Sequence, residues 1–326
     1  MKVAPISTHD CFLLKTPYRP LSTHEVNERL RPRVSLSLFE YVRLKVSQYQ
    51  KYISIFAMIM HAVQMIAVIV FVLTMPNLKR GDGEFPVYVP AKHWYQAGLN
   101  DTIVFTGTDV SRSYTLERAF SFSIPWSMIF FFAWSFLAML SYTRCLNSDV
   151  RDDHLLLSIR LRYFEYAVSA SVMIIAIALE AGVSDLYTLL SFAVFIFITN
   201  MAGLVADLQF DVSSDASTIW YTQYLAWGTF VSAFSMIMAS FYYNISKSIL
   251  KPPWFVYVVV FQMFVLYAMF GAVQVFDFWH RKSTVWVSVV RTEHLRFVVA
   301  LYDILSLTAK SNLAWFILIP VITGQI

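Results

Sequence analysis

Residues 297–322 read FVVALYDILSLTAKSNLAWFILIPVI, an apolar run interrupted by one aspartate and one lysine. A helix that crosses a bilayer needs about 20 mostly apolar residues, so this run is long enough to span a membrane. Lys310 follows Phe297 by 13 positions, which is about 20 Å along a helix and therefore near the middle of the bilayer. A charged side chain at that depth costs at least about 2.5 kcal/mol, so we treat Lys310 as a functional residue.

The rest of the chain also has the composition of a membrane protein. It is 58% hydrophobic and 14% charged, whereas about a quarter of the residues are charged in a soluble protein. Seven windows are long and apolar enough to span a bilayer, which predicts an all-α bundle of seven transmembrane helices. The windows are 52–75, 120–143, 157–182, 185–206, 219–243, 254–279 and 297–322.

Few residues remain outside these windows. We divide the chain into an N-terminal segment, residues 1–50, and a seven-helix membrane domain, residues 51–326. The first loop, residues 76–119, holds two β-prone runs, PVYVP at 86–90 and TIVFT at 102–106, with turn-forming residues between them. Two such runs joined by turn formers predict a β-hairpin, and an irregular loop is the alternative.

The distribution of basic residues predicts the orientation in the membrane. If the N-terminal segment is cytoplasmic, sixteen of the 25 Lys and Arg residues lie inside and seven outside. Cytoplasmic loops carry an excess of Lys and Arg, so we expect a cytoplasmic N-terminus and an extracellular C-terminus. The net charge of +4 is small and the basic residues are scattered, which argues against a nucleic-acid partner.

The third window supplies a partner for Lys310. Residues 158–182 read SIRLRYFEYAVSASVMIIAIALEAG, in which Arg162 and Glu165 are three positions apart and therefore share one helix face. A lysine buried this deeply must be paired, deprotonated by desolvation or chemically converted, for example to an imine with an aldehyde cofactor. Glu165 would balance the positive charge, and Arg162 would keep the Glu165 carboxylate ionised. Two alternatives stay open: Asp303 is a rival partner, and the charged cluster could serve only to fasten the helices.

The motifs around these charges resemble those of heliorhodopsins. Proton-pumping microbial rhodopsins have Arg-x-x-Asp on the third helix and an aspartate one turn before the lysine, whereas this chain has Arg162-x-x-Glu165 and Ser306. The Ser-x-x-x-Lys arrangement on the seventh span is similar to that of heliorhodopsins, as is the expected inverted topology. The third helix adds further similar positions, namely Tyr166, Ser169, Ala170, Ser171 and Met173.

The resemblance implies a cofactor and a function. It implies all-trans retinal held as a protonated Schiff base on Lys310, with Glu165 as counterion, in a multi-pass membrane photoreceptor for sensory transduction. It also implies a homodimer in the lipid bilayer, and it does not indicate a signalling partner. The chain departs from familiar members in one respect, because they pair histidines from the first two helices. His61 lies in the first span, but the second span has no histidine.

The rest of the pocket is predicted from side-chain type. A slot for retinal needs aromatic and apolar walls with few polar groups. The candidates, together with Lys310, Glu165, Ser306 and Arg162, are Met173, Ser169, Asn200, Trp227, Phe270 and Gln274. For the last six, ordinary helix packing is an equally good explanation.

Three functions remain. A non-pumping light sensor is favoured, because pumps carry a carboxyl three turns beyond the counterion and here that position is Ala176. The alternative is a light-gated proton or cation conductor, in which Glu180, Asp185 and His61 line a path; they could equally be solvated helix ends and packing groups. A lesser alternative is a seven-helix receptor without retinal, which would normally have its N-terminus outside. No enzyme is expected, because metal-ligand spacings, phosphate-binding glycine loops and nucleophile elbows are missing from the sequence.

Overall fold

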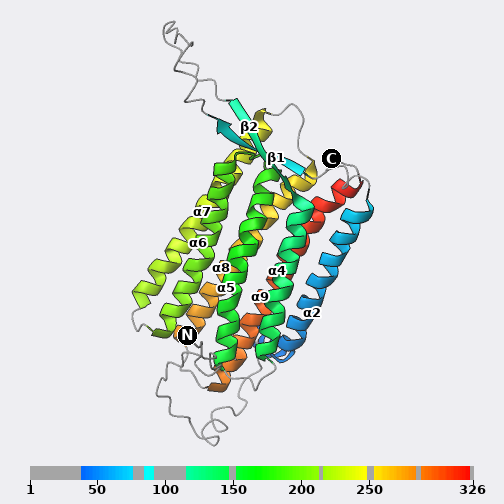
Figure 1. Cartoon of the computed structure of the whole chain (residues 1–326). Helices are drawn as coiled ribbons and strands as arrows, with labels where there is room; N and C mark the ends of the chain where they lie inside the picture. Colours follow the sequence, from blue (N-terminus) through cyan, green and yellow to red (C-terminus); the bar gives the residue numbers. More distant parts are fainter. Residues whose placement is uncertain are drawn as a thin grey trace, which may run out of the picture.

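The computed structural model describes residues 38–75, 84–91, 115–146, 152–212, 216–247, 253–283 and 288–323. Within them, seven helices are long and apolar enough to cross a membrane, and Figure 1 shows them side by side in one bundle. The predicted seven-helix fold is confirmed. The helices are α2 (Leu38–Thr74), α4 (Ile124–Leu146), α5 (Asp152–Glu180), α6 (Leu186–Val212), α7 (Ala216–Lys247), α8 (Trp254–Ser283) and α9 (Ser288–Thr323).

The two helices that carry the intramembrane charges are the inner helices of the bundle. In the most apolar stretch of α5 and α9, 61% and 67% of the residues are buried, against 22–44% in the other five spans. Helix α5 packs against α4, α6 and α9, and α9 packs against α2, α5 and α8. The charged groups within these two spans, Arg162, Glu165, Asp303 and Lys310, are buried inside the protein.

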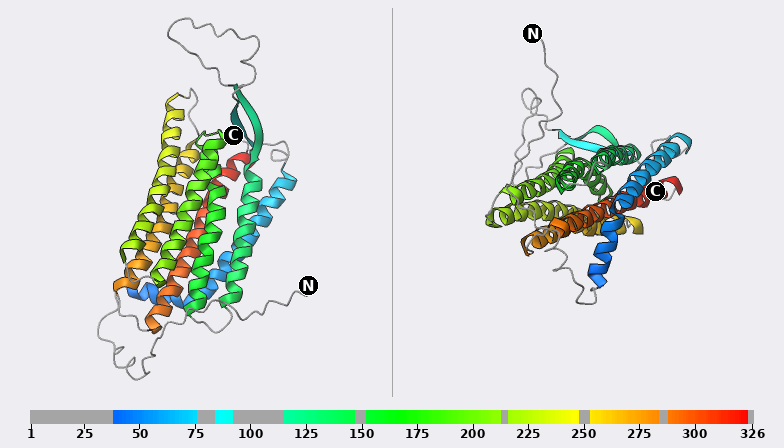
Figure 2. Two further views of the ribbon diagram at one scale, coloured as in Figure 1. Left: turned by 60° about the vertical axis from the view of Figure 1, so that its left-hand side comes forward. Right: turned by 90° about the horizontal axis from the view of Figure 1, so that it is seen from below.

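Helix α2 is longer than its predicted window. It begins at Leu38, 14 positions before the window 52–75, whose choice excluded the charged and polar residues of the first turns. Figure 2 shows these turns, in the darkest blue, lying across the end of the bundle before the helix rises along it. The boundary at residue 50 falls inside this helix, and the division into two segments stays a prediction.

A two-stranded antiparallel hairpin covers the end of the bundle where α5 meets α6 (Figure 1). Its strands are β1 (Glu84–Ala91) and β2 (Thr115–Ser123). The first predicted strand is confirmed, but its partner is 115–123 rather than 102–106, which lies outside the described residues. Strand β2 runs directly into α4. The strand that pairs with β1 is therefore anchored by a transmembrane helix. The backbone N–H of Tyr88 donates to the Ser184 carbonyl at 2.9 Å, which ties the hairpin to the α5–α6 turn.

The α5–α6 turn depends on a glycine and on a capping aspartate. Gly182 has φ of +85°, and a Cβ there would lie 2.5 Å from the side-chain nitrogen of Asn244, so only glycine fits this left-handed turn. The Asp185 carboxylate accepts hydrogen bonds from the Thr188 backbone N–H at 2.8 Å and its hydroxyl at 2.6 Å. Asp185, a candidate for an ion path, therefore acts as the N-cap of α6.

Candidate functional site

Lys310 and Glu165 meet in the centre of the bundle. The Lys310 side chain is 2% exposed, and its Nζ donates to Glu165 Oε1 at 2.6 Å and to Ser306 Oγ at 3.0 Å. The same Nζ lies 5.2 Å from the ring centroid of Tyr166. Lys310 thus contacts both Glu165 and Ser306, which were singled out with it in the sequence.

Serines on two helices hold the Glu165 carboxylate in place. Besides the bond from Lys310, Oε1 accepts one from Ser135 Oγ at 2.6 Å and one from Ser169 Oγ at 3.2 Å. Ser135 belongs to α4 and was not among the predicted site residues, because a serine in an apolar helix gives no signal by itself. The carboxylate is therefore oriented from α4, α5 and α9 together.

The ion pair of Arg162 differs from the expectation. Its Nη1 donates to Asp303 on α9, not to the Glu165 carboxylate one turn along α5. The other oxygen of Asp303 accepts a hydrogen bond from Ser54 Oγ at 2.5 Å, and Ser54 accepts one from Gln50 Nε2 at 2.9 Å. Helix α5 packs along α9, so Asp303 and Lys310 of α9 face Arg162 and Glu165 of α5. Each cation therefore pairs with a different carboxylate.

Next to Lys310 lies a cavity bounded by α5, α6, α7, α8 and α9. Glu165 and Arg162 are not among its lining residues. The predicted residues that do line it are Lys310, Ser306, Ser169, Met173, Asn200, Trp227, Phe270 and Gln274.

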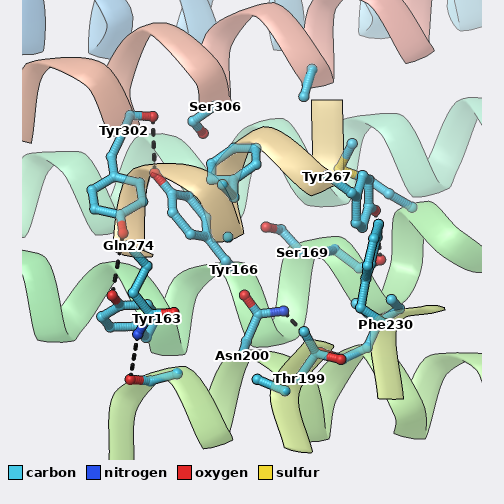
Figure 3. A pocket seen from close by; sticks show the side chains of 18 of the residues that line it. Tyr163, Tyr166, Ser169, Thr199, Asn200, Phe230, Tyr267, Gln274, Tyr302 and Ser306 are labelled. Carbon is cyan, nitrogen blue, oxygen red and sulfur yellow. Dashed lines mark hydrogen bonds between the residues drawn. The ribbon is translucent and has the colours of Figure 1, made fainter. Parts of the chain in front are cut away.

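Tyrosines form much of the wall and were missed in the sequence. Figure 3 shows Tyr163, Tyr166, Tyr267 and Tyr302 around the cavity. Their hydroxyls are bonded within the protein: Tyr163 to the Tyr302 hydroxyl at 3.2 Å, and Tyr166 to the Tyr302 carbonyl at 3.1 Å. The chain has 18 tyrosines, and the only signal for two of these was their position beside Glu165.

The far wall of the cavity depends on a glycine. A Cβ built on Gly271 of α8 would lie 2.7 Å from Cζ2 of Trp227 on α7, a separation that real side chains do not tolerate. The indole of Trp227 therefore occupies the space that a larger residue would take. The walls of the cavity are thus largely aromatic and apolar, and Lys310 is among the residues that line it.

Comparison with known proteins agrees with this geometry. The family model of the heliorhodopsins matches residues 49–322. The chain belongs to the heliorhodopsin family. It is therefore a member of a family of seven-helix retinal photoreceptors.

A solved structure gives independent support for the fold of this heliorhodopsin. The crystal structure of a cyanorhodopsin from Tolypothrix sp. is similar, with a TM-score of 0.51, 13% sequence identity, and coverage of 83% of this chain and 92% of that chain. At this identity the likeness shows the fold alone. No match was found among curated proteins.

Two ionisable candidates for an ion path have buried side-chain atoms without hydrogen bonds in the described part of the chain. Neither ring nitrogen of His61 has a hydrogen-bond partner within the described residues, and the ring packs 5.9 Å from that of Phe132. Glu180 Oε1, at the end of α5, is likewise without a partner in the described part of the chain. His61 thus packs against an aromatic ring, as a core histidine does.

A second buried charge cluster, which the sequence did not reveal, joins α5, α6, α8 and α9. Asp207 accepts from Arg160 at 3.1 Å and from Arg281 at 3.0 Å. Arg281 also pairs with Asp277 at 2.5 Å, and Asp277 contacts His294 Nε2 at 2.8 Å. The cluster adjoins the cavity, because Asp277 is one turn from the cavity residue Gln274.

Proposed function

We propose that this heliorhodopsin is a non-pumping light sensor in which Lys310 carries all-trans retinal and Glu165 is the counterion. The observation that carries the proposal is the 2.6 Å contact between Lys310 Nζ and Glu165 Oε1 beside the aromatic cavity. When bound, retinal supplies absorption of visible light and a double bond that isomerises.

Lys310 would hold retinal through its side-chain nitrogen, as a Schiff base formed with loss of one water. The protonated linkage would carry one positive charge beside Glu165. Glu165 then keeps its role as the neighbouring anion, which a buried cation requires.

Absence of pumping is supported by two positions. Ala176, three turns beyond Glu165, is 1% exposed and has no group that exchanges protons. Ser306, one turn before Lys310, donates or accepts a hydrogen bond but carries no charge. Proton-pumping microbial rhodopsins have a carboxyl group at both of these positions.

A second candidate, a light-gated proton or cation conductor, is favoured by Glu180. Its buried carboxyl oxygen lacks a hydrogen-bond partner among the described residues, as a transient ion or proton site would require. Photocurrents under voltage clamp separate the two candidates. A steady light-driven current that reverses with the gradient would replace the sensor by the conductor.

The proposed placement in the membrane is N-terminus cytoplasmic and C-terminus extracellular. It is supported by the excess of Lys and Arg on the N-terminal side of the bundle. A homodimer remains a prediction from the family resemblance. Cross-linking in native membranes, compared with detergent, tests the dimer.

Pigment formation tests the central proposal. The chain expressed with all-trans retinal should show a visible absorption band, and Lys310→Ala should lack it. Lys247→Ala is the matched control, because Lys247 is exposed at the end of α7 and should leave the band unchanged. Covalent retinal in Lys310→Ala, detected after borohydride reduction, would show that another amine carries the cofactor.

A further inference from the structure

We propose that Asp303 is a positioning residue: its ion pair holds Arg162 away from Glu165, so that Glu165 serves Lys310 alone. This inference rests on the proposed function, because it concerns the counterion of the Lys310 linkage. It assigns to the buried Asp303–Arg162 pair a role in setting the colour of the pigment.

The first support is the balance of buried charge. Two cations, Lys310 and Arg162, and two carboxylates, Glu165 and Asp303, are each at most 2% exposed. A buried charge without a partner is strongly destabilising, so each cation needs its own carboxylate. The structure pairs them Lys310 with Glu165 and Arg162 with Asp303, and both pairs join α5 to α9.

The second support is that Asp303 is braced from a third helix. Its Oδ1 accepts from Arg162, while its Oδ2 accepts from Ser54 of α2 at 2.5 Å. Gln50, one turn earlier on α2, donates to Ser54 at 2.9 Å. This chain of bonds fixes the Asp303 carboxylate, and thereby the side on which Arg162 finds its anion.

The third support is that Arg162 retains unused donors. Its Nε and Nη2 make no hydrogen bond within the described residues, and its guanidinium lies 4.9 Å from the ring centroid of Tyr142. Arg162 and Glu165 are one helical turn apart, with Cβ atoms separated by about 5–6 Å. An Arg162 released from Asp303 therefore has the Glu165 carboxylate within reach of its long side chain.

The consequence for the pigment follows from electrostatics. An anion beside the linkage stabilises the positive charge where it resides before light is absorbed, and so raises the excitation energy. If Arg162 shares Glu165, the field of that anion at the linkage weakens and the band moves to longer wavelength. Loss of Asp303 should therefore have an effect that requires Arg162.

The experiment is a double-mutant cycle on the absorption band. Asp303→Asn should red-shift the band, and Arg162→Gln combined with Asp303→Asn should return it toward the wild-type position. Asp303→Glu, which keeps the anion, should rescue the wild-type band. Ser54→Ala removes only the hydrogen bond from Ser54 to Asp303, so it should shift the band in the same direction by a smaller amount. This variant replaces Asp303→Asn in the test if Asp303→Asn folds poorly.

A second readout requires no retinal. Infrared difference spectra, taken between each retinal-free protein and its Arg162→Gln counterpart after labelling with ¹³C-guanidino arginine, isolate the Arg162 guanidinium from the other carboxylate-bound arginines. They should show a carboxylate-bound Arg162 in Asp303→Asn, and this signature should be lost when Glu165→Gln is added. A signature already lost in Asp303→Asn alone would overturn the inference. So would a band shift that persists in the double variant without Arg162, or a band unchanged in both Asp303→Asn and Ser54→Ala. Failure of the proposed function is distinct, because it would appear as covalent retinal in Lys310→Ala whatever the state of Asp303.

Discussion

Lys310 and Glu165 are 145 positions apart in the chain, yet Nζ of one lies 2.6 Å from Oε1 of the other. The contact joins α9 to α5, the two inner helices of the bundle. It places a cation and an anion together in a medium where neither is tolerated alone. The predictions below concern this pair, the cavity beside it and the framework that holds both.

Neutralising Glu165 should disturb the pigment more than any other single change in the cluster. Glu165→Gln removes the anion at 2.6 Å from Nζ, so the linkage either loses its proton and absorbs in the near ultraviolet at neutral pH or stays protonated and absorbs at longer wavelength. The spectrum recorded across a pH titration measures which occurs. Asp303→Asn is the comparison: a large spectral change there, with Glu165→Gln unmoved, would transfer the counterion role to Asp303.

The size of residue 271 should control the far wall of the cavity. Gly271→Ala places a Cβ 2.7 Å from Trp227, so the indole must move and the band or the rate of retinal uptake should change. Gly228→Ala on α7 is the matched control, because nothing lies within 4 Å of a Cβ added there. Exchanging glycine for alanine in an unstrained helix stabilises by about 0.4–1 kcal/mol, so this control should keep its band and bleach no faster on heating. Equal spectra for both variants would remove Trp227 from the pocket wall.

The second charge cluster should contribute to stability rather than to colour. Asp207→Asn leaves Arg160 and Arg281 short of a buried carboxylate, and breaking a buried pair costs about 3–5 kcal/mol. The visible band should keep its wavelength but disappear at a lower temperature than in the wild type. Glu84→Gln, at an exposed hairpin position, should bleach like the wild type. A melting temperature unchanged by Asp207→Asn would mean that the cluster is not needed for stability.

Topology should follow the basic residues. An epitope tag at Met1 should react with antibody only after permeabilisation, because the predicted topology with a cytoplasmic N-terminus places sixteen of the 25 Lys and Arg residues inside. A tag after Ile326 should react on intact cells. Labelling in the reverse pattern would place the Asp207 cluster at the extracellular side.

Much of the fold was readable from the sequence because hydropathy is a local property. A stretch of about 20 apolar residues must be a helix in lipid, since its backbone groups find partners only within the helix. Counting residues along such helices gives the depth of Lys310 in the membrane, and it places Glu165 at a similar depth. The same count identified Asp303 as a rival of Glu165 for Lys310, but it did not predict that Asp303 pairs with Arg162.

The contacts between helices were decided by the tertiary structure. Helix association in membranes depends on close packing and on hydrogen bonds between helices, and neither leaves a local pattern in a sequence. Ser54, Ser135 and Tyr302 reach the site from α2, α4 and α9, and each is an ordinary residue in its own span. The spans and the reactive lysine are therefore properties of single segments. The pairing of Arg162 with Asp303 and of Lys310 with Glu165 depends on distances between helices. It is therefore determined only when α2, α4, α5 and α9 are packed together.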